Sequence, residues 1–423
     1  MEKSSRHKGV FAALTALHPL VDLISAALFT CAAEDAWEAI LYNGVAFVLQ
    51  LPLGIVLDRC ACSLRRLLAQ SWLLLVGGCA IYAFTGESVP AIAVACLGNA
   101  VFHIAAGRHL LAEDRGRTGR TSMFISTGAI GLLLGMKFGA ECPLSTIVAP
   151  MAVSAALVGL VWKPAAVHCA NERPVEACRG SWLEITALVL LGALVVWRSC
   201  GVLTATRAFS SVHSGVSFVF ALAFCSWLGQ AVSGYAADRY GRFWLLVASL
   251  VGSAALCWLC PVDFTVGYLL LMFVAQLATG PVMSYLYRAA SSRAGLAFGV
   301  NCLALFVSTL VPNCPLGFLW FMAGEWLTLA LEYASTAWVK LPHWFWAVMS
   351  VNLLTHPALM YVVMRLGASS AVVLTGEVSV VLIEGAVLSV LYRRRWSWWR
   401  LFAVSAWMNA VSYFTWELLR SGF

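Results

Sequence analysis

The stretch Gly234-Tyr-Ala-Ala-Asp238-Arg239-Tyr-Gly241-Arg242 decides the fold, because the chain carries the same pattern twice. The earlier copy begins Gly54-Ile-Val-Leu-Asp58-Arg59, 180 residues before the later one. Each copy follows one apolar segment and precedes another, which predicts a tight, basic hairpin between two membrane helices. A signature repeated at this spacing indicates two homologous halves. Paired halves around a midplane site are typical of secondary transporters.

The two loops resemble the signature Gly-x-x-x-Asp-Arg-x-Gly-Arg of the major facilitator superfamily, which joins helices 2 and 3 and helices 8 and 9. The later copy departs from it at the last basic position, which is Phe243, and the earlier copy lacks the second glycine. The resemblance covers residues 1–336. It implies that each aspartate caps a neighbouring helix, that each arginine pairs with a carboxylate, and that these gating loops lock the outward-open state. The implied gating residues are Gly54, Asp58, Arg59, Gly234, Asp238, Arg239, Gly241 and Arg242.

Composition places the chain in a membrane. Hydrophobic residues make up 61% of it and charged residues only 11%, whereas soluble proteins carry about 25% charged residues. Fifteen apolar stretches are each long enough to cross a hydrocarbon core of ~30 Å. The positive charges fall mostly in alternate loops, which predicts a multi-pass protein of the cytoplasmic (inner) membrane with its N-terminus in the cytoplasm. The net charge of +7 therefore reflects membrane orientation and is no argument for nucleic acid.

The predicted fold is an all-α polytopic membrane protein with two six-helix bundles and about three extra C-terminal membrane helices. We expect an N-terminal bundle at 1–162, a cytoplasmic linker at 163–181, a second bundle at 182–336 and a three-helix extension at 337–423. The predicted spans are 10–32, 37–57, 67–85, 89–111, 122–140, 143–162, 182–203, 214–235, 243–261, 264–287, 294–312, 315–336, 343–365, 370–392 and 398–418.

Ionisable groups inside spans are costly and are therefore candidates for a functional site. His18 and Asp22 stand four residues apart, so they share a helical face on either side of Pro19, and could exchange a proton. Asn99 and His103 have the same spacing in the fourth span. A central cluster of these residues would form a substrate or proton pathway, whereas the alternative is a polar pair that only holds helices together.

Phe102-His103 resembles the Phe-His of the fourth helix in fosmidomycin-resistance-like facilitators, although Ile104 replaces the usual proline. Lys137 and Glu141 are four apart near the end of the fifth span, where an ion pair could line the pathway or be purely structural. Further polar candidates are Arg198, Gln230 and Gln276.

The C-terminal extension has its own polar residues. Asn352 and His356 share a face of the thirteenth span, and Glu377 and Glu384 share a face of the next. They could form a cation site or a proton relay, but the favoured interpretation is that they join three helices by hydrogen bonds. Cys60 and Cys62 lack the partner pair that a zinc site needs, so no metal site and no cofactor are expected.

These patterns predict a secondary active transporter that moves a small organic molecule by alternating access, driven by a proton or another coupling ion, with efflux favoured. We expect a monomer in contact with membrane lipid, without nucleic acid and without enzyme activity, since no Walker loop is present. Two alternatives stay open: a non-transporting sensor or assembly protein on the same scaffold, and a membrane enzyme whose site lies in the extension.

Overall fold

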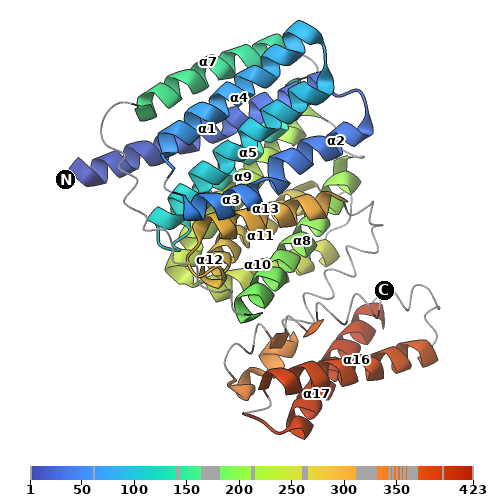
Figure 1. Ribbon diagram of the computed structural model, residues 1–423. Helices are drawn as coiled ribbons and strands as arrows, with labels where there is room; N and C mark the ends of the chain where they lie inside the picture. The colour runs from blue at the N-terminus through green and yellow to red at the C-terminus, as the bar shows by residue number, and fades with distance from the viewer. Residues whose placement is uncertain are drawn as a thin grey trace. The chain divides into compact units, whose positions relative to one another are not determined.

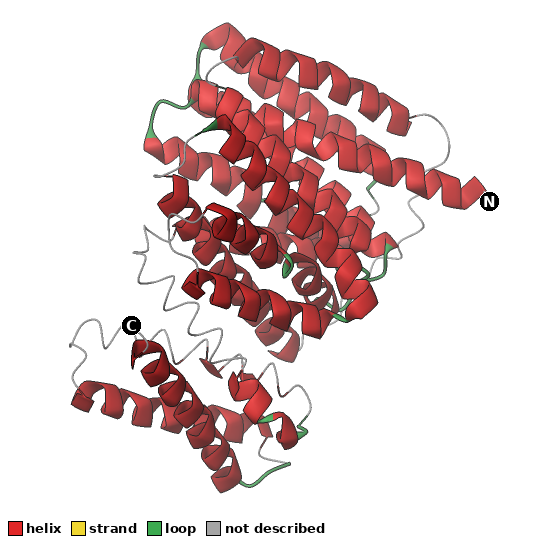
Figure 2. Ribbon diagram, turned by 180° about the vertical axis from the view of Figure 1, so that it is seen from behind, coloured by secondary structure: helices red, strands yellow, loops and turns green. Residues whose placement is uncertain are grey.

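In the computed structural model the chain is helical, and no strand occurs among the residues described (Figure 2). Eight helices in this part of the chain are long and apolar enough to cross a membrane, so the expected all-α, multi-pass membrane protein is confirmed. The described residues are 2–60, 62–139, 143–162, 182–210, 215–259, 265–310, 331–341, eight positions from 344 to 359 (344, 347, 348, 351, 352, 355 and 359 among them), 370–392 and 395–421.

Helices of the first half match the predicted spans closely (Figure 1). The second span is interrupted by a π-helical turn at Gly44–Val48 and is counted as one span, Trp37–Arg59. The helices are α1 (Glu2–Ala32), α2 (Ala36–Asn43), α3 (Gln50–Arg59), α4 (Leu64–Thr85), α5 (Ser88–Glu113), α6 (Gly119–Phe138) and α7 (Pro143–Trp162).

The second half repeats this order up to the eleventh predicted span. Its tenth span bends between α11 and α12, and Pro281 lies in the first turn of α12, where its missing N–H leaves no hydrogen bond unmade. The helices are α8 (Trp182–Ser210), α9 (Val216–Tyr240), α10 (Arg242–Leu259), α11 (Thr265–Gln276), α12 (Thr279–Ala289) and α13 (Ala294–Leu310). The predicted linker at 163–181 and most of the predicted span at 315–336 lie outside the described residues.

The chain divides into two compact units, one of residues 1–249 and 260–314 and the other of 250–259 and 315–423. Both homologous halves thus belong to the first unit, and the second begins earlier than the predicted extension at 337. The second unit contains a short 3₁₀ turn (Ala337–Val339), α16 (Ser370–Tyr392) and α17 (Trp398–Ser421), and α16 packs against α17. The predicted span at 343–365 lies largely outside the described residues.

Within the first unit the halves meet at two helix pairs, α3 with α13 and α6 with α9. Glycine allows both close approaches. A Cβ at Gly54 would overlap the carbonyl oxygen of Gly295, and a Cβ at Gly234 would overlap that of Thr118. The first residue of each signature loop is therefore glycine because the backbone of the opposite half lies against it.

Candidate functional site

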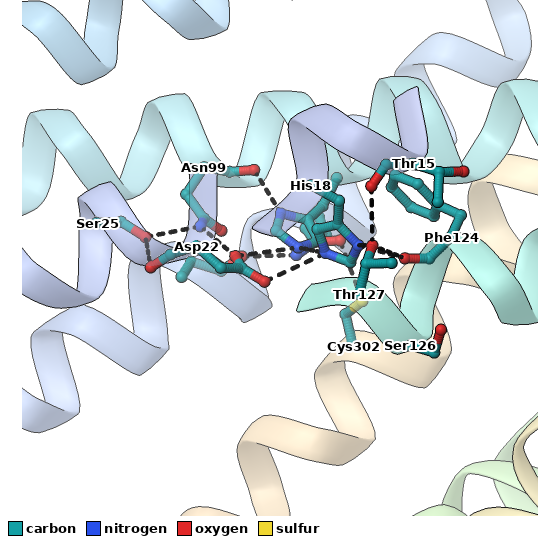
Figure 3. Close-up of polar contacts among 12 residues, drawn as sticks. Thr15, His18, Asp22, Ser25, Asn99, Phe124, Ser126, Thr127 and Cys302 are labelled. Atoms are coloured by element: carbon teal, nitrogen blue, oxygen red, sulfur yellow. Dashed lines mark hydrogen bonds and ion pairs between the residues drawn. The ribbon is translucent and has the colours of Figure 1, made fainter. Parts of the chain in front are cut away.

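A buried polar cluster, here called the His–Asp cluster, brings together His18 and Asp22 of α1 with Asn99 and His103 of α5 (Figure 3). His18 is only 3% exposed and Asn99 only 4%. Gly128 of α6 makes room for them, because a Cβ there would overlap His18 and Asp22. The two predicted pairs, each set by helical spacing, thus meet at one place between three helices.

The cluster is centred on three side-chain groups. His18 Nε2 lies 2.6 Å from His103 Nε2, 3.2 Å from Asp22 Oδ2, and His103 Nε2 lies 3.4 Å from Asp22 Oδ1. The Asn99 amide donates to Asp22 Oδ1 and to Ser25 Oγ, both at 2.9 Å. Two imidazoles and one carboxylate therefore share a site with little water, which strengthens the interactions between their charges.

The other nitrogen of each imidazole fixes its protonation pattern. His18 Nδ1 lies 2.5 Å from the Phe124 carbonyl oxygen, and His103 Nδ1 lies 2.9 Å from that of Asn99. A carbonyl oxygen only accepts, so we infer that both Nδ1 atoms carry hydrogen. In the neutral rings both Nε2 atoms would then face each other with lone pairs. One additional proton between them resolves this conflict, and the Asp22 carboxylate balances its charge.

His18, Asp22 and His103 are also a group whose donor atoms, all within 4.8 Å of one another, could surround a metal ion. The spacing of the imidazoles favours the proton. Zn–N bonds are about 2.0–2.1 Å long, so two tetrahedral nitrogen ligands lie roughly 3.3 Å apart. The Nε2 atoms are closer than that, at 2.6 Å. The expectation of no metal site remains a prediction.

Two parts of this site were not anticipated from the sequence. Pro19 has no N–H for the Thr15 carbonyl, as expected, but the Thr127 hydroxyl of α6 donates to that carbonyl at 3.1 Å. The freed carbonyl is therefore occupied by the protein itself. Ser25 lies three residues after Asp22 on the same helical face, so helical spacing could have identified it.

Lys137 lies half-buried in the last turn of α6. Its proposed partner Glu141 lies outside the described residues. The predicted ion pair stays a prediction.

In the first signature loop, Asp58 caps a helix of the opposite half. Its Oδ1 accepts from the Gly295 amide at 2.9 Å and its Oδ2 from the Leu296 amide at 2.8 Å, in the first turn of α13. A carboxylate satisfies free amides there and complements the positive end of the helix. Arg108 of α5 donates to the same carboxylate at 3.2 Å.

In the second loop, Asp238 does the same in the reverse direction. Its Oδ2 accepts from the Thr118 and Gly119 amides at the start of α6, both at 3.0 Å. Arg242 Nη2 lies 3.6 Å from Asp238 Oδ1 and donates to the Gly116 carbonyl at 3.2 Å. Each half therefore caps a helix of the other.

The arginine partners differ from those that the resemblance implied. The residues paired with the two loop aspartates are Arg108 and Arg242, whereas Arg59 and Arg239 are exposed. Arg239 lies over the Tyr240 ring, 5.5 Å from its centre. Gly241 ends α9 with a φ of 99°, a conformation that favours glycine.

The loop between α5 and α6, which Asp238 holds, contains a second carboxylate. Burial raises the pKa of the Asp114 carboxyl, and the adjacent Arg120 opposes this shift. Arg120 Nε donates to Asp114 Oδ1 at 2.7 Å.

We expect the Asp238→Ala and Asp58→Ala variants each to lose about 1–2 kcal/mol of stability, the usual value for a lost helix cap. Thermal unfolding of the purified protein measures the loss. Hydrogen exchange should rise at 118–122 in the first variant and at 294–298 in the second. Equal exchange at both sites in each variant would contradict the reciprocal caps.

The second unit has a buried polar network around two glutamates, here called the glutamate network. Glu384 of α16 is fully buried and accepts hydrogen bonds from Thr355 and Asn409, both at 2.8 Å. Glu332 is 1% exposed, accepts from Asn352 at 2.6 Å and is also bonded by Ser412.

Among the predicted tail residues, Asn352 and Glu384 join this network, Glu377 lies two turns earlier on α16, and His356 lies outside the described residues. Glu332 was missed because the sequence pattern placed it in the preceding bundle. The arrangement has hydrogen bonds from separate segments of the tail meeting at buried carboxylates, as expected for residues that hold helices together.

We expect Glu384→Leu to lower stability by about 1–2 kcal/mol, because buried donors in a membrane protein lose their acceptor. Glu384→Gln should cost less, since its amide oxygen still accepts. Ser379→Leu, on an exposed face of α16, is the matched control. Unfolding midpoints that fall equally for Glu384→Leu and the control would contradict the proposed role of the carboxylate.

Comparison with known protein families gives no match, and comparison with curated proteins gives none either. Among solved structures, the fold is similar to a variant of the Escherichia coli fucose:proton symporter FucP, with a TM-score of 0.54 and 16% sequence identity. The match covers 81% of this chain and 97% of that one. It is similar also to FucP described as a major facilitator superfamily transporter in the outward conformation, with a TM-score of 0.54, 13% identity and the same coverage. At such identities the similarity establishes the fold.

Proposed function

Because the chain has the major facilitator fold, we propose that it is a secondary active transporter that moves a small organic molecule across the membrane by alternating access. The single observation that carries coupling to protons is the 2.6 Å contact between the Nε2 atoms of His18 and His103 beside the Asp22 carboxylate. Such a cluster is nearly neutral with one extra proton and negative without it. Intramembrane carboxylates and histidines of this kind are used as proton relays.

The proposed cycle uses the two sets of contacts between the halves. With Asp58 and Asp238 capping helices of the opposite half, the loop ends of α3, α13, α6 and α9 are held together. Release of both caps would let the bundles rock apart at this end. We propose that Gly54, Asp58, Gly234, Asp238, Gly241 and Arg242 act in this gate, with Arg59 and Arg239 at its exposed rim.

We place the protein in the cytoplasmic membrane with the signature loops and the N-terminus on the cytoplasmic side, supported by the distribution of Lys and Arg. Export is the proposed direction, on the apolar composition of the spans. Asn99 positions Asp22 in this scheme, and Lys137 and Glu141 lie toward the other end of the pathway.

The test is the internal pH of proteoliposomes that hold the purified full-length chain, followed with a trapped pH-sensitive dye. Sugars, lipophilic cations, organic anions and amino acids are added in turn, with empty liposomes as the control. A substrate of the transporter should cause proton movement that depends on the protein. If no compound moves protons although the protein is folded and inserted, the proposal of coupled transport is wrong and a sensor function gains support.

A further inference from the structure

Arg198, on α8 within a predicted span, has no carboxylate partner among the residues that the structure describes. Its Nη1 donates to Thr279 Oγ1 of α12 at 2.9 Å, while its Nε is buried and has no hydrogen-bond partner. A guanidinium is charged at all accessible pH values, and a charge inside a membrane protein is costly unless it is paired. The protein thus holds a cation whose counter-ion comes from elsewhere.

The surroundings of Arg198 also include an unsatisfied acceptor. Gln230 of α9 donates through Nε2 to Gln276 Oε1 at 3.1 Å, and its own Oε1 is buried without a partner. The Thr279 hydroxyl lies 3.4 Å from the same Gln276 oxygen. Arg198, Gln230, Gln276 and Thr279, here called the Arg198 cluster, therefore offer a free N–H donor with positive charge and a free amide oxygen.

The Arg198 cluster occupies positions equivalent to those of the His–Asp cluster in the other half. Arg198 lies 180 residues after His18, and Thr279 lies 180 residues after Asn99, the same offset that separates Gly54 from Gly234. The seventh and tenth spans thus carry polar residues where the first and fourth carry the His–Asp cluster. In an inverted or paired repeat, equivalent positions near the midplane are where substrates and coupling ions bind.

We propose that the Arg198 cluster binds the carboxylate of a small 2-hydroxy or 2-amino acid, which is the substrate of the transport function proposed above. The planar guanidinium matches a carboxylate, and its Nε edge is the one that remains open. The free Gln230 oxygen accepts a hydrogen bond from the neighbouring hydroxyl or amino group of the substrate. The bound acid neutralises Arg198 in one half as the proton neutralises Asp22 in the other.

Binding to the purified full-length protein in detergent tests this, with L-lactate as the probe and the uncharged lactamide as its matched control. Glycolate and L-serine extend the panel. Lactate, glycolate or serine should shift the thermal unfolding midpoint of the unchanged protein, and lactamide should not. Arg198→Gln should weaken the apparent affinity at least about tenfold, as expected for a lost charged hydrogen bond. Arg288→Gln, at an exposed position of α12, should leave it unchanged.

Arg198→Lys provides a second variant that keeps the charge but not the fork, and it too should bind the acids more weakly. Equal affinity in the unchanged protein and in Arg198→Lys or Arg198→Gln overturns the proposal, as does a panel in which no acid binds. Proton flux driven by an uncharged compound and undiminished in Arg198→Gln would overturn this site while leaving the transport function intact. Lactate binding that depends on Arg198 but produces no proton flux would support the site and overturn coupled transport.

Discussion

Asp22→Asn is expected to reduce ligand-driven proton flux about 100-fold or more. The carboxylate balances the proton held between His18 Nε2 and His103 Nε2, and it lies 3.2 and 3.4 Å from these atoms. Removing one partner of a buried charge pair costs about 3–5 kcal/mol, which corresponds to a factor of roughly 100 to 5,000 in an equilibrium constant. The variant should therefore fail to take up the coupling proton.

The measurement compares initial rates of internal pH change in proteoliposomes with equal amounts of inserted protein. Glu87→Gln removes a carboxylate from an exposed loop position and is the matched control. His103→Gln should behave like Asp22→Asn, because it removes the second imidazole from the same contact. Proton flux at the unchanged rate in Asp22→Asn would show that the His–Asp cluster is only structural.

Gly54→Val is expected to shift the protein away from the state in which the signature loops are closed, by about tenfold or more. A side chain at this position would overlap the Gly295 carbonyl oxygen and drive α3 away from α13. Overpacking of this kind costs about 1–3 kcal/mol, and 1.4 kcal/mol is a factor of ten in population. The Asp58 cap on α13 would be lost as the helices separate.

Hydrogen exchange followed by mass spectrometry measures this shift without labels. Exchange should increase in peptides from the first turn of α13 and from the end of α3, and the transport rate should fall. Gly234→Val should produce the same change at the start of α6, because its neighbour there is Thr118. Gly159→Val is the matched control, since a Cβ at Gly159 of α7 meets no atom within 4 Å. Similar exchange in Gly54→Val and the control would contradict the proposed gate.

Some of the candidate site could be predicted because its signals are local. His18 with Asp22, and Asn99 with His103, are each four residues apart, and a helix places such residues on one face wherever it lies. The contact between the two pairs is 77 to 85 residues apart in sequence and depends on how α1, α5 and α6 pack. The same reason explains why Ser25 could have been found, whereas the Thr127 bond to the Thr15 carbonyl could not.

The loop carboxylates show the same division. The pattern Gly-x-x-x-Asp placed each aspartate one turn after a glycine, and the resemblance implied a cap. Which amides are capped, and that Arg108 and Arg242 rather than Arg59 and Arg239 are the paired cations, follows from the packing of one half on the other. Glu332 was assigned to the second bundle, because apolar stretches give span positions without the partner helices.

The sequence by itself determined that the chain crosses a membrane many times, that it consists of two homologous halves, and where most helices begin and end. These features rest on hydropathy, charge and spacing along the chain, which act within about 20 residues. Only the tertiary structure decided that two histidines share a contact beside Asp22, that each half caps a helix of the other, and that Arg198 is left without a carboxylate. Those outcomes depend on side chains brought together from distant spans, and hydrophobic periodicity does not encode which helices become neighbours.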